Sequence, residues 1–489
     1  MFRTLLLLHR YLGIAFGLIV ALWCLSGFVM MYVQYPELDR QEYLAGQSPL
    51  DFENCCTAAA AMGTRTFHEF TIEMLAGRPV VRAGGLVIDL QTGRSYEAID
   101  AATAEKQAEH FLANSAVAGG VHLLEQLERD QWTVASSFDA HRPLYKFAAE
   151  DQAGTEIYVS GNDGRVVQAT TSNERFWNWL GAVTHWIYPT ALRQHPALWA
   201  QIIIWLSVAS LFLVVVGVYL GIKQFGARAD GSRSPYHGLN LWHHYSGLIF
   251  GLLTITWLFS GLLSMNPWGL FQSSGTFLEH ERMRSGEIDA DELQRSLAAI
   301  ATEALPAGTV QLRSSILNDD LSLLAKDATG RTTRLDGGTL RPLPLPDGIW
   351  TDIGELLRPD TRILDSGIMT VEDEYYFSHH EKVALPVYRI TFDDEEHTRY
   401  YFDPVSAELL AKFDSDARWY RWLFLGLHRG DFTAALRGRP AWDLILLPLL
   451  AGVTLGSVTG VWMGYRRLRR RPGELSADIA SNSDERFAK

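Results

Sequence analysis

Four histidines stand in two repeated contexts, and their positions are the strongest chemical signal in this chain. Residues 9–31 read HRYLGIAFGLIVALWCLSGFVMM and residues 243–265 read HHYSGLIFGLLTITWLFSGLLSM, so each apolar stretch begins with a histidine. Two further histidines end similar Trp-containing segments, WLGAVTH at His185 and WLFLGLH at His428. The positions shared by the two apolar stretches, at a constant offset, are His9, Tyr11, Gly13, Phe16, Gly17, Trp23, Ser26 and Gly27, matched by His243, Tyr245, Gly247, Phe250, Gly251, Trp257, Ser260 and Gly261.

The spacing within each stretch is that of one helix face. His9, Gly13 and Gly17 are four residues apart, and the repeat has the same spacing after His243. Glycines on one face leave room for another helix or for a flat macrocycle. A pair of neutral imidazoles is a suitable axial ligand set for a haem iron that transfers electrons. The repeat therefore predicts His9 with His243 near one membrane surface, and His185 with His428 near the other.

Another interpretation of each feature stays open. An ionisable residue in a membrane span is costly unless it is paired, interfacial or a ligand. A single interfacial histidine more often hydrogen-bonds or reaches towards water, and glycines more often serve helix packing. The third span also begins with two histidines, His243 and His244. The repeat favours His243 as the ligand and leaves His244 as a neighbour, an alternative ligand or a partner for haem propionates.

The elements that must position these histidines are membrane helices. Four apolar stretches, near 11–33, 198–222, 245–265 and 443–464, each have about the 20 residues that a helix needs to cross a bilayer. The chain of 489 residues is therefore predicted to be an α+β membrane protein with a tandem duplication. Its predicted parts are a first transmembrane helix (1–34), an outer module (35–197), a second transmembrane helix (198–222), a cytoplasmic loop (223–242), a third transmembrane helix (243–267), a second outer module (268–441), a fourth transmembrane helix (442–465) and a cytoplasmic tail (466–489).

Basic residues predict the orientation of the spans. They flank the first span, fill the short middle loop and follow the last span. The positive-inside rule then places both termini in the cytoplasm and both long segments outside, in the periplasm of a bacterium with two membranes. The formal charge of −13 argues against a nucleic-acid partner. The first apolar core is too long for a signal peptide and has no small-residue cleavage site after it, so we expect a retained helix.

The two outer segments show mixed helix and strand patterns. Residues 102–114 and 290–304 are predicted helices, and 131–136 reads as a strand. Hairpins are predicted at 84–99 and 155–170, the latter around Asn-Asp-Gly. Each segment is therefore expected to form an α+β module with a short meandering sheet.

Missing motifs limit the chemistry. Three cysteines without a Cys-x-x-Cys-His motif exclude covalently attached c-type haem and an iron–sulfur cluster. The adjacent Cys55 and Cys56 are expected to be separate thiols, because a disulfide between neighbours is strained. No dinucleotide-binding or P-loop motif occurs, and the cytoplasmic parts are too short for a flavin domain. Electrons would have to come from a separate cytoplasmic reductase or from membrane quinol.

With these features the chain resembles the PepSY-associated transmembrane family, from His9 to about Arg471. The resemblance is carried by the His-Arg-aromatic-Leu-Gly opening at His9–Gly13 and by the strand–turn–strand TRYYFDPVSAELL at 398–410. Some members resemble inner-membrane ferric-siderophore reductases, in which histidines at the span ends hold b-type haem. The resemblance implies PepSY-like outer modules, two haems b and electron flow from a donor through an inner and an outer haem to a periplasmic ferric siderophore.

PepSY modules in other settings resemble peptidase-inhibitory or regulatory domains. The alternative is therefore a membrane-tethered binding or regulatory protein, surrounded by lipid at its four spans, with structural histidines and no redox activity. A transporter is a weaker alternative, because both repeats have the same orientation and no span is broken near its middle.

Overall fold

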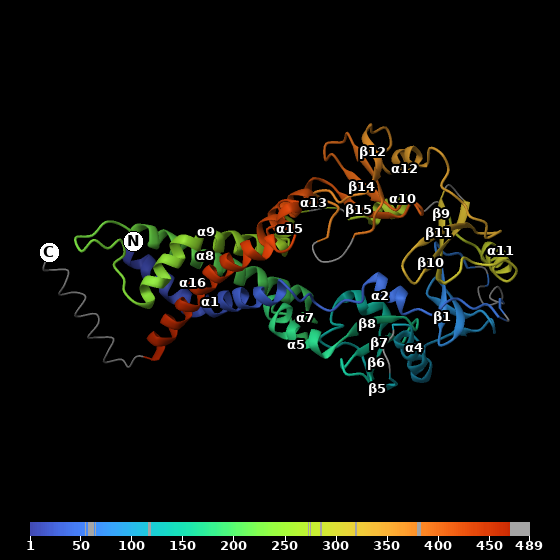
Figure 1. The fold of residues 1–489 in the computed structure, drawn as a ribbon, viewed down its shortest axis with the longest axis horizontal. Coiled ribbons are helices and arrows are strands. Elements are labelled where there is room, and N and C mark those ends of the chain that lie inside the picture. The colour runs from blue at the N-terminus through green and yellow to red at the C-terminus, as the bar shows by residue number, and fades with distance from the viewer. Residues whose placement is uncertain are drawn as a thin grey trace. The chain divides into compact units, whose positions relative to one another are not determined.

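The computed structural model describes residues 1–53, 55–56, 63, 65–115, 119–271, 273, 275–283, 286–317, 320–378 and 383–469. They form two compact units, each assembled from separated stretches of the chain (Figure 1). The helical unit contains Met1–Gln34, Trp177–Phe271 and the chain from Trp419 onward. The sheet unit contains Tyr35–Phe176 and Gln272–Arg418.

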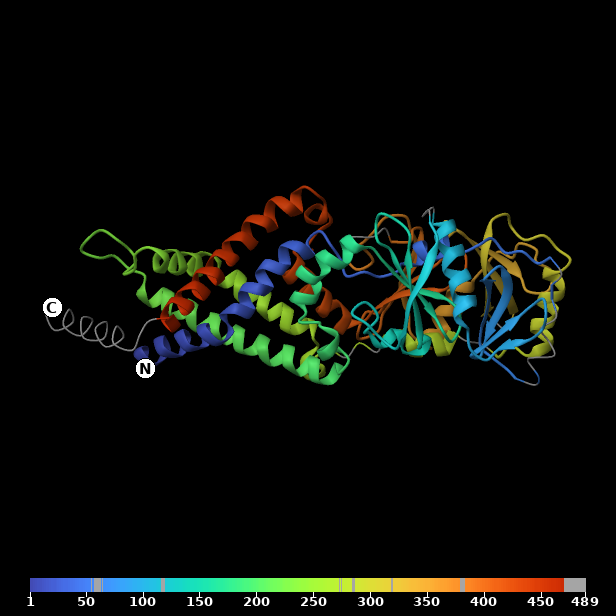
Figure 2. The same cartoon turned by 90° about the horizontal axis from the view of Figure 1, so that it is seen from below.

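Four long helices build the helical unit, and each is long and apolar enough to cross a membrane. Helix α1 packs against α8 and α16, and α9 packs against the same two helices (Figures 1 and 2). The predicted spans 11–33, 198–222, 245–265 and 443–464 coincide with these helices to within a few residues at most ends, although α1 begins well before residue 11. Their bounds are α1 Phe2–Met30, α8 Pro196–Gln224, α9 Leu239–Ser264 and α16 Ala441–Arg469.

Short helical segments connect the long helices to the rest of the chain. The first group precedes α8, and the second precedes α16. The first consists of α5 Ser172–Leu180, α6 Ala182–His185 and α7 Thr190–Arg193. The second consists of α13 Ser415–Tyr420, the π-helical turn Arg421–Gly426, α14 Leu427–Arg429 and α15 Ala434–Arg437.

One seven-stranded sheet joins the two outer segments of the chain. Its strand order is β11-β10-β9-β1-β2-β3-β4, and the junction is the antiparallel pair β1–β9, where Thr71 lies opposite Arg313 and Ile72 opposite Leu312. Local sequence patterns indicate strands but not their distant partners, so the prediction of two separate modules does not describe how these strands pair. The bounds are β1 Phe70–Leu75, β2 Arg78–Ala83, β3 Leu86–Asp89, β4 Ser95–Tyr96, β9 Thr309–Leu317, β10 Asp320–Asp327 and β11 Thr332–Asp336.

Each outer segment also has a four-stranded antiparallel meander of its own. The orders are β5-β6-β7-β8 and β12-β13-β14-β15. The hairpins predicted at 84–99 and 155–170 are confirmed as β3–β4 and β7–β8. The strand predicted at 131–136 is wrong, because this stretch is irregular and packs Trp132 and Thr133 into the interior. The bounds are β5 Val121–Leu127, β6 Leu144–Ala149, β7 Glu156–Ser160, β8 Val166–Thr170, β12 Ile363–Met369, β13 Val387–Phe392, β14 Arg399–Phe402 and β15 Leu409–Phe413.

Both predicted helices of the sheet unit are confirmed, and each begins at an aspartate cap. Helix α4, Ala101–Asn114, is capped by Asp100, whose side chain accepts the Thr103 amide. Helix α11, Ala290–Ile300, begins with a capping box of Asp289 and Glu292. The remaining short elements are α2 Arg40–Ala45, α10 Phe277–Met283, α12 Ile349–Leu357, and 3₁₀ turns at Ser136–His141 and Pro267–Gly269.

Two predictions about single residues, one on the cysteines and one on a pair of neighbouring histidines, can be set against the structure. Cys55 and Cys56 form a disulfide, so the expectation of separate thiols is wrong, whereas Cys24 is a buried free thiol. The neighbouring histidines His379 and His380, which are a weak candidate for a metal site beside Glu374, lie outside the described residues.

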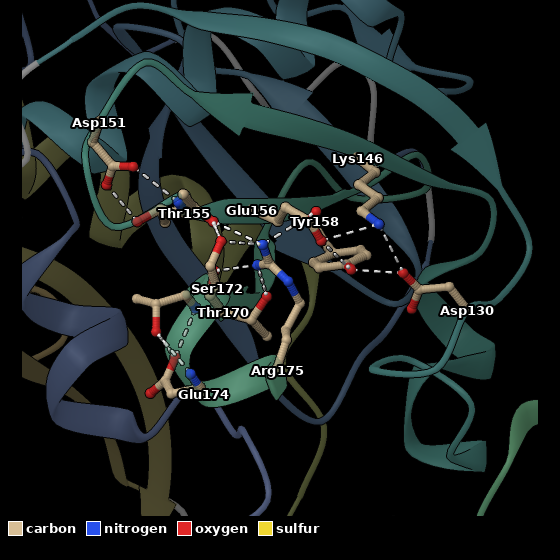
Figure 3. Close-up of polar contacts among 12 residues, drawn as sticks. Asp130, Lys146, Asp151, Thr155, Glu156, Tyr158, Thr170, Ser172, Glu174 and Arg175 are labelled. Carbon is tan, nitrogen blue, oxygen red and sulfur yellow. Dashed lines mark hydrogen bonds and ion pairs between the residues drawn. The ribbon is translucent and has the colours of Figure 1, made fainter. Parts of the chain in front are cut away.

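Polar contacts hold the first meander to the start of α5 (Figure 3). Asp130 accepts hydrogen bonds from Lys146 at 3.2 Å and from the Tyr158 hydroxyl at 2.6 Å. Glu156 pairs with Lys146 at 3.0 Å and with Arg175 at 3.4 Å. The second meander repeats the contacts of Asp130 at a constant interval along the chain. There Asp373 accepts from Arg389 at 3.4 Å and from Tyr401 at 2.8 Å.

Candidate cofactor sites at two histidine pairs

The structure brings the four predicted histidines together in two pairs, both inside the helical unit. His9 on α1 faces His243 on α9, with ring centroids 6.2 Å apart and ring planes 38° apart. His185 at the end of α6 faces His428 on α14, again with centroids 6.2 Å apart and with planes at 72°. The sequence repeat predicted these partners, and we call them the inner pair and the outer pair.

The distance between the rings suits a metal between two imidazoles. An imidazole nitrogen lies about 2 Å from a metal that it ligates and about 1 Å from its own ring centre, so two opposed ligands have centroids about 6 Å apart. Two imidazoles in van der Waals stacking would lie closer. Among the residues that the structure describes, no group of three or more His, Cys, Asp or Glu side chains gathers as a metal cage. Each pair therefore fits a metal whose remaining ligands come from a cofactor, as in haem.

In the inner pair, a main-chain carbonyl orients each ring. His9 Nδ1 lies 3.1 Å from the carbonyl oxygen of Leu213 on α8, and His243 Nδ1 lies 2.9 Å from that of Gly456 on α16. A carbonyl only accepts, so each Nδ1 carries the hydrogen and each Nε2 keeps a free lone pair. A bond from Nδ1 to a carbonyl is the common way in which proteins hold a ligating histidine.

In the outer pair, a serine and a carbonyl share this role. His185 Nδ1 lies 3.0 Å from Ser26 Oγ and 3.2 Å from the Trp23 carbonyl oxygen. His428 Nδ1 lies 3.1 Å from Ser260 Oγ and 3.2 Å from the Trp257 carbonyl oxygen. Within the described chain, Nε2 of none of the four histidines has a hydrogen-bond partner, so all four present a nitrogen lone pair for a ligand.

His244 differs from these four because both of its ring nitrogens are engaged. Nδ1 lies 2.8 Å from Ser234 Oγ, and Nε2 lies 2.9 Å from the Gly221 carbonyl oxygen. The side chain is buried, with only 6% of its surface exposed. The geometry thus leaves Nε2 of His243 without a hydrogen-bond partner among the described residues and gives His244 a structural place between α8 and Ser234 of the loop that joins α8 to α9.

Glycines make the close approach of the inner histidines feasible. A Cβ at Gly217 would lie 2.5 Å from His9 Cε1, and one at Gly460 would lie 3.0 Å from His243 Cε1. Each glycine is four residues after the residue whose carbonyl accepts the histidine, so its missing side chain opens the path to that carbonyl. The repeated segments VGVYLG and TGVWMG contain both glycines, and that repeat is the signal from which their role can be read.

A cavity of about 790 Å³ surrounds the inner pair, within the range of protein cofactor sites. It lies among α1, α8, α9 and α16, and Gly13 and Gly247 line it beside the two histidines. Among the described residues, no side chain approaches an added Cβ at Gly247 within 4 Å, and Leu213 alone does so at Gly13, at 3.9 Å. These glycines therefore border open space, as the walls of a site for a flat macrocycle would.

The two pairs lie far apart along the spans. His9 stands near the start of α1, whereas Ser26, which contacts His185, stands near its end. At 1.5 Å per residue this separation is about 25 Å, close to the thickness of the bilayer core. Burial lowers the pKa of His185 to about 4 and that of His428 to about 3, where the neighbouring His185 adds to the effect. Both outer rings are thus held in the neutral form that ligates a metal.

The sequence did not single out Arg467, Leu213 or Gly456, which also surround the inner pair. Leu213 and Gly456 act through their main chains, so their residue types carry no signal. His195 and His237 do not join a pair: His195 caps α8 without a side-chain hydrogen bond, and His237 lines the inner cavity.

Comparison with known families agrees with this architecture. The model of the PepSY-associated transmembrane region matches residues 6–467, which include all four helices and both histidine pairs. A comparison with curated proteins gives no match. Since the match extends over nearly the whole chain, this multi-pass membrane protein belongs to the PepSY-associated transmembrane family.

Proposed function

We propose that this protein is a di-haem b protein of the bacterial inner membrane that carries electrons outward to a ferric siderophore. His9 and His243 would hold the inner haem, and His185 and His428 the outer one. The observation that carries the proposal is the repeated pair geometry: two rings 6.2 Å apart, each with its Nδ1 hydrogen-bonded and its Nε2 free.

The chemistry that the bound group would supply is one-electron transfer by an iron with two imidazole ligands. The chain itself supplies orientation, because each ring is fixed by a hydrogen bond to another segment. It also supplies an apolar surrounding, since the four helices that enclose the pairs are apolar over most of their length. The similar halves arise, in this proposal, from a tandem duplication that gives each pair one histidine from each half.

The direction of the transfer rests on the orientation of the spans. By the positive-inside rule, the basic residues favour an orientation with the pair His9–His243 on the cytoplasmic side and both long segments between the spans in the periplasm. There the substrate would be a ferric ion held by hard oxygen donors, and one electron would reduce it to ferrous ion. Hard donors bind the less charged ion more weakly, so reduction would release the iron. The electron donor would be a separate cytoplasmic reductase or membrane quinol.

The first test is the visible spectrum of the detergent-purified full-length protein, oxidised and after dithionite, with a pyridine haemochrome count. We expect b-type spectra and about two haems per chain. A folded protein that stays colourless when produced in haem-sufficient cells would overturn the proposal. The preferred function would then be that of a membrane-tethered PepSY binding protein.

The second test concerns the substrate. Protein reduced with dithionite, and freed of excess reductant, is mixed with a ferric hydroxamate or catecholate siderophore and a ferrous chelator that reports by colour. We expect the haem bands to return to their oxidised form while the ferrous chelate appears. One ferrous ion should be chelated for each electron that the haems lose. A haem protein that is not reoxidised by either siderophore class would remain a transmembrane electron carrier, but not a siderophore reductase.

A further inference from the structure

The inner cavity is chemically unequal on its two sides, although the sequence repeat makes its histidines equivalent. Arg10 follows His9, whereas His244 follows His243. Arg467 lies seven residues after Gly460, whereas Gln224 lies seven residues after the equivalent Gly217. All four residues line the cavity. The two arginines belong to α1 and α16, and their counterparts His244 and Gln224 belong to α9 and α8.

The two arginines lie on helices that pack against each other. Helices α1 and α16 pack tightly at this level, where a Cβ at Gly464 would lie 3.4 Å from Ile14. Arg10 of α1 and Arg467 of α16 both line the cavity. Within the described part of the chain, no Asp or Glu forms an ion pair with either arginine or lines the cavity. Three arginines, Arg10, Arg466 and Arg467, therefore line one cavity without a carboxylate from the described residues.

The opposite side of the cavity is already satisfied by the chain itself. His244 uses both ring nitrogens, and the Gln224 side chain accepts a hydrogen bond of 2.7 Å from the Tyr236 hydroxyl. Among the residues that the structure describes, the arginines that line the cavity, Arg10, Arg466 and Arg467, all belong to α1 and α16. Arginine is suited to this role because its guanidinium binds a carboxylate through two parallel hydrogen bonds.

We propose that Arg10 and Arg467 bind the two propionate carboxylates of the inner haem and so fix which way round the macrocycle lies. This inference rests on the proposed function. It assigns the arginines a binding role that the positive-inside rule alone does not require, since that rule needs basic residues at the cytoplasmic ends but not inside a cavity. It also explains why the halves differ here: a macrocycle with both acids on one edge needs the charges on one side only.

The test compares haem with its dimethyl ester, in which both carboxylates are masked. The haem-depleted full-length protein is titrated with each compound, and the inner site is identified as the one that the His9→Ala variant lacks. We expect the natural protein to bind haem about tenfold to a hundredfold more tightly than the ester at this site, the range for charge-assisted hydrogen bonds. Arg10→His with Arg467→Gln, which copies the counterparts in the repeat, should bind both compounds alike.

Two variants control for loss of structure. Arg469→Gln removes a neighbouring basic residue of α16 that stacks on Tyr465 and does not line the cavity, so it should keep full discrimination. The double variant Arg10→Lys with Arg467→Lys keeps both positive charges and should keep most of the discrimination between haem and its dimethyl ester. Equal binding of haem and ester by the natural protein, or the same loss in Arg469→Gln, would overturn this inference and leave the two haems in place. Failure of the natural protein to bind haem at all would instead overturn the proposed function.

Discussion

The inner and the outer histidine pair have the same separation but are held in different ways. The inner histidines belong to the spanning helices α1 and α9, and main-chain carbonyls of α8 and α16 orient them. The outer histidines belong to short segments between strands and spans, and serines of α1 and α9 orient them together with carbonyls. Either pair joins the two halves of the chain, but both outer histidines contact a serine hydroxyl at 3.0–3.1 Å, whereas the inner pair has one longer side-chain contact, from Thr459 to His243 at 3.4 Å.

This difference shows what each location requires. At the inner pair, helices that pack closely across a glycine bring a carbonyl of one helix within reach of a histidine on another. At the outer pair the carbonyls of Trp23 and Trp257 lie 3.2 Å from the histidines, and a serine hydroxyl adds a second, nearer contact. Ser26 and Ser260 are fully or nearly fully buried, and each already donates its own hydrogen to a carbonyl of its helix, so its oxygen is free to accept from Nδ1. The outer pair is therefore the one that a side-chain substitution can loosen.

The largest expected effect comes from removing a ligand. His9→Ala or His243→Ala should each remove the inner haem, and His185→Ala or His428→Ala the outer one, because one imidazole cannot hold a low-spin iron alone. Pyridine haemochrome counts should fall from about two to about one per chain, with different residual potentials for the two groups of variants. His195→Ala, at an exposed cap, should keep both haems, and equal residual spectra in all four variants would contradict the assignment of separate pairs.

The second largest effect is expected when an alanine replaces a glycine beside a histidine ring. Its size should depend on how much space each glycine leaves. A Cβ would lie 2.5 Å from His9 at Gly217, 3.0 Å from His243 at Gly460 and 3.4 Å from His428 at Gly261. Gly217→Ala should therefore displace its histidine most, Gly460→Ala less, and Gly261→Ala least. Loss of the haem beside the changed glycine, the inner one for Gly217 and Gly460 and the outer one for Gly261, and changed electron paramagnetic resonance of the haem that is retained measure this order. Gly226→Ala is the control, because no described atom lies within 4 Å of a Cβ added there. An equal effect in all four variants would refute the expected order.

A smaller effect should separate the outer pair from the inner one. Ser26→Ala and Ser260→Ala remove one of two acceptors for Nδ1, so the outer haem should be retained with an affinity reduced by about tenfold or less. Its midpoint potential should shift while that of the inner haem stays unchanged, as redox titration of the visible bands can show. The matched inner change is Thr459→Ala, which removes a contact of 3.4 Å to His243 Nδ1 and should shift only the inner potential.

The smallest effect on either pair is expected from acid in the sheet unit. Burial alone would raise the pKa of Glu73, but ion pairs with Arg82 and Arg165 outweigh it and lower the pKa. A lowered carboxyl pKa stabilises the fold above the ordinary pKa of glutamate, and this stability is lost as the pH falls through the folded value. Glu73→Ala should destabilise the sheet unit by about 3–5 kcal/mol at neutral pH, since it leaves the buried Arg82 with a hydrogen bond to the Asp163 carbonyl but without the carboxylate of its ion pair.

Calorimetry of the Glu73→Ala variant measures this loss, while the reduced haem bands report on the histidine pairs. The natural protein should lose sheet-unit stability below about pH 4, and the variant should show a weaker dependence on pH there. Haem bands that change together with the unfolding of the sheet unit would show that the pairs are not independent of it.

The sequence by itself determined the four spans, the histidine partners and most local elements. Repeats in the chain matched His9 to His243 and His185 to His428, the residue patterns at 102–114 and 290–304 predicted α4 and α11, and the Asn-Asp-Gly turn predicted the β7–β8 hairpin. These signals are local or repeated, so they can be read without knowledge of contacts. The ligand role of the histidines stays a prediction.

Only the tertiary structure decided how distant segments meet. It paired β1 with β9 across the two outer segments, placed the Leu213 and Gly456 carbonyls beside the inner rings, and engaged both nitrogens of His244. It also set Arg10 beside Arg467 on one side of the cavity. Main-chain carbonyls have no residue type, and strand edges accept any partner of matching register, so such contacts leave no mark in the order of the residues.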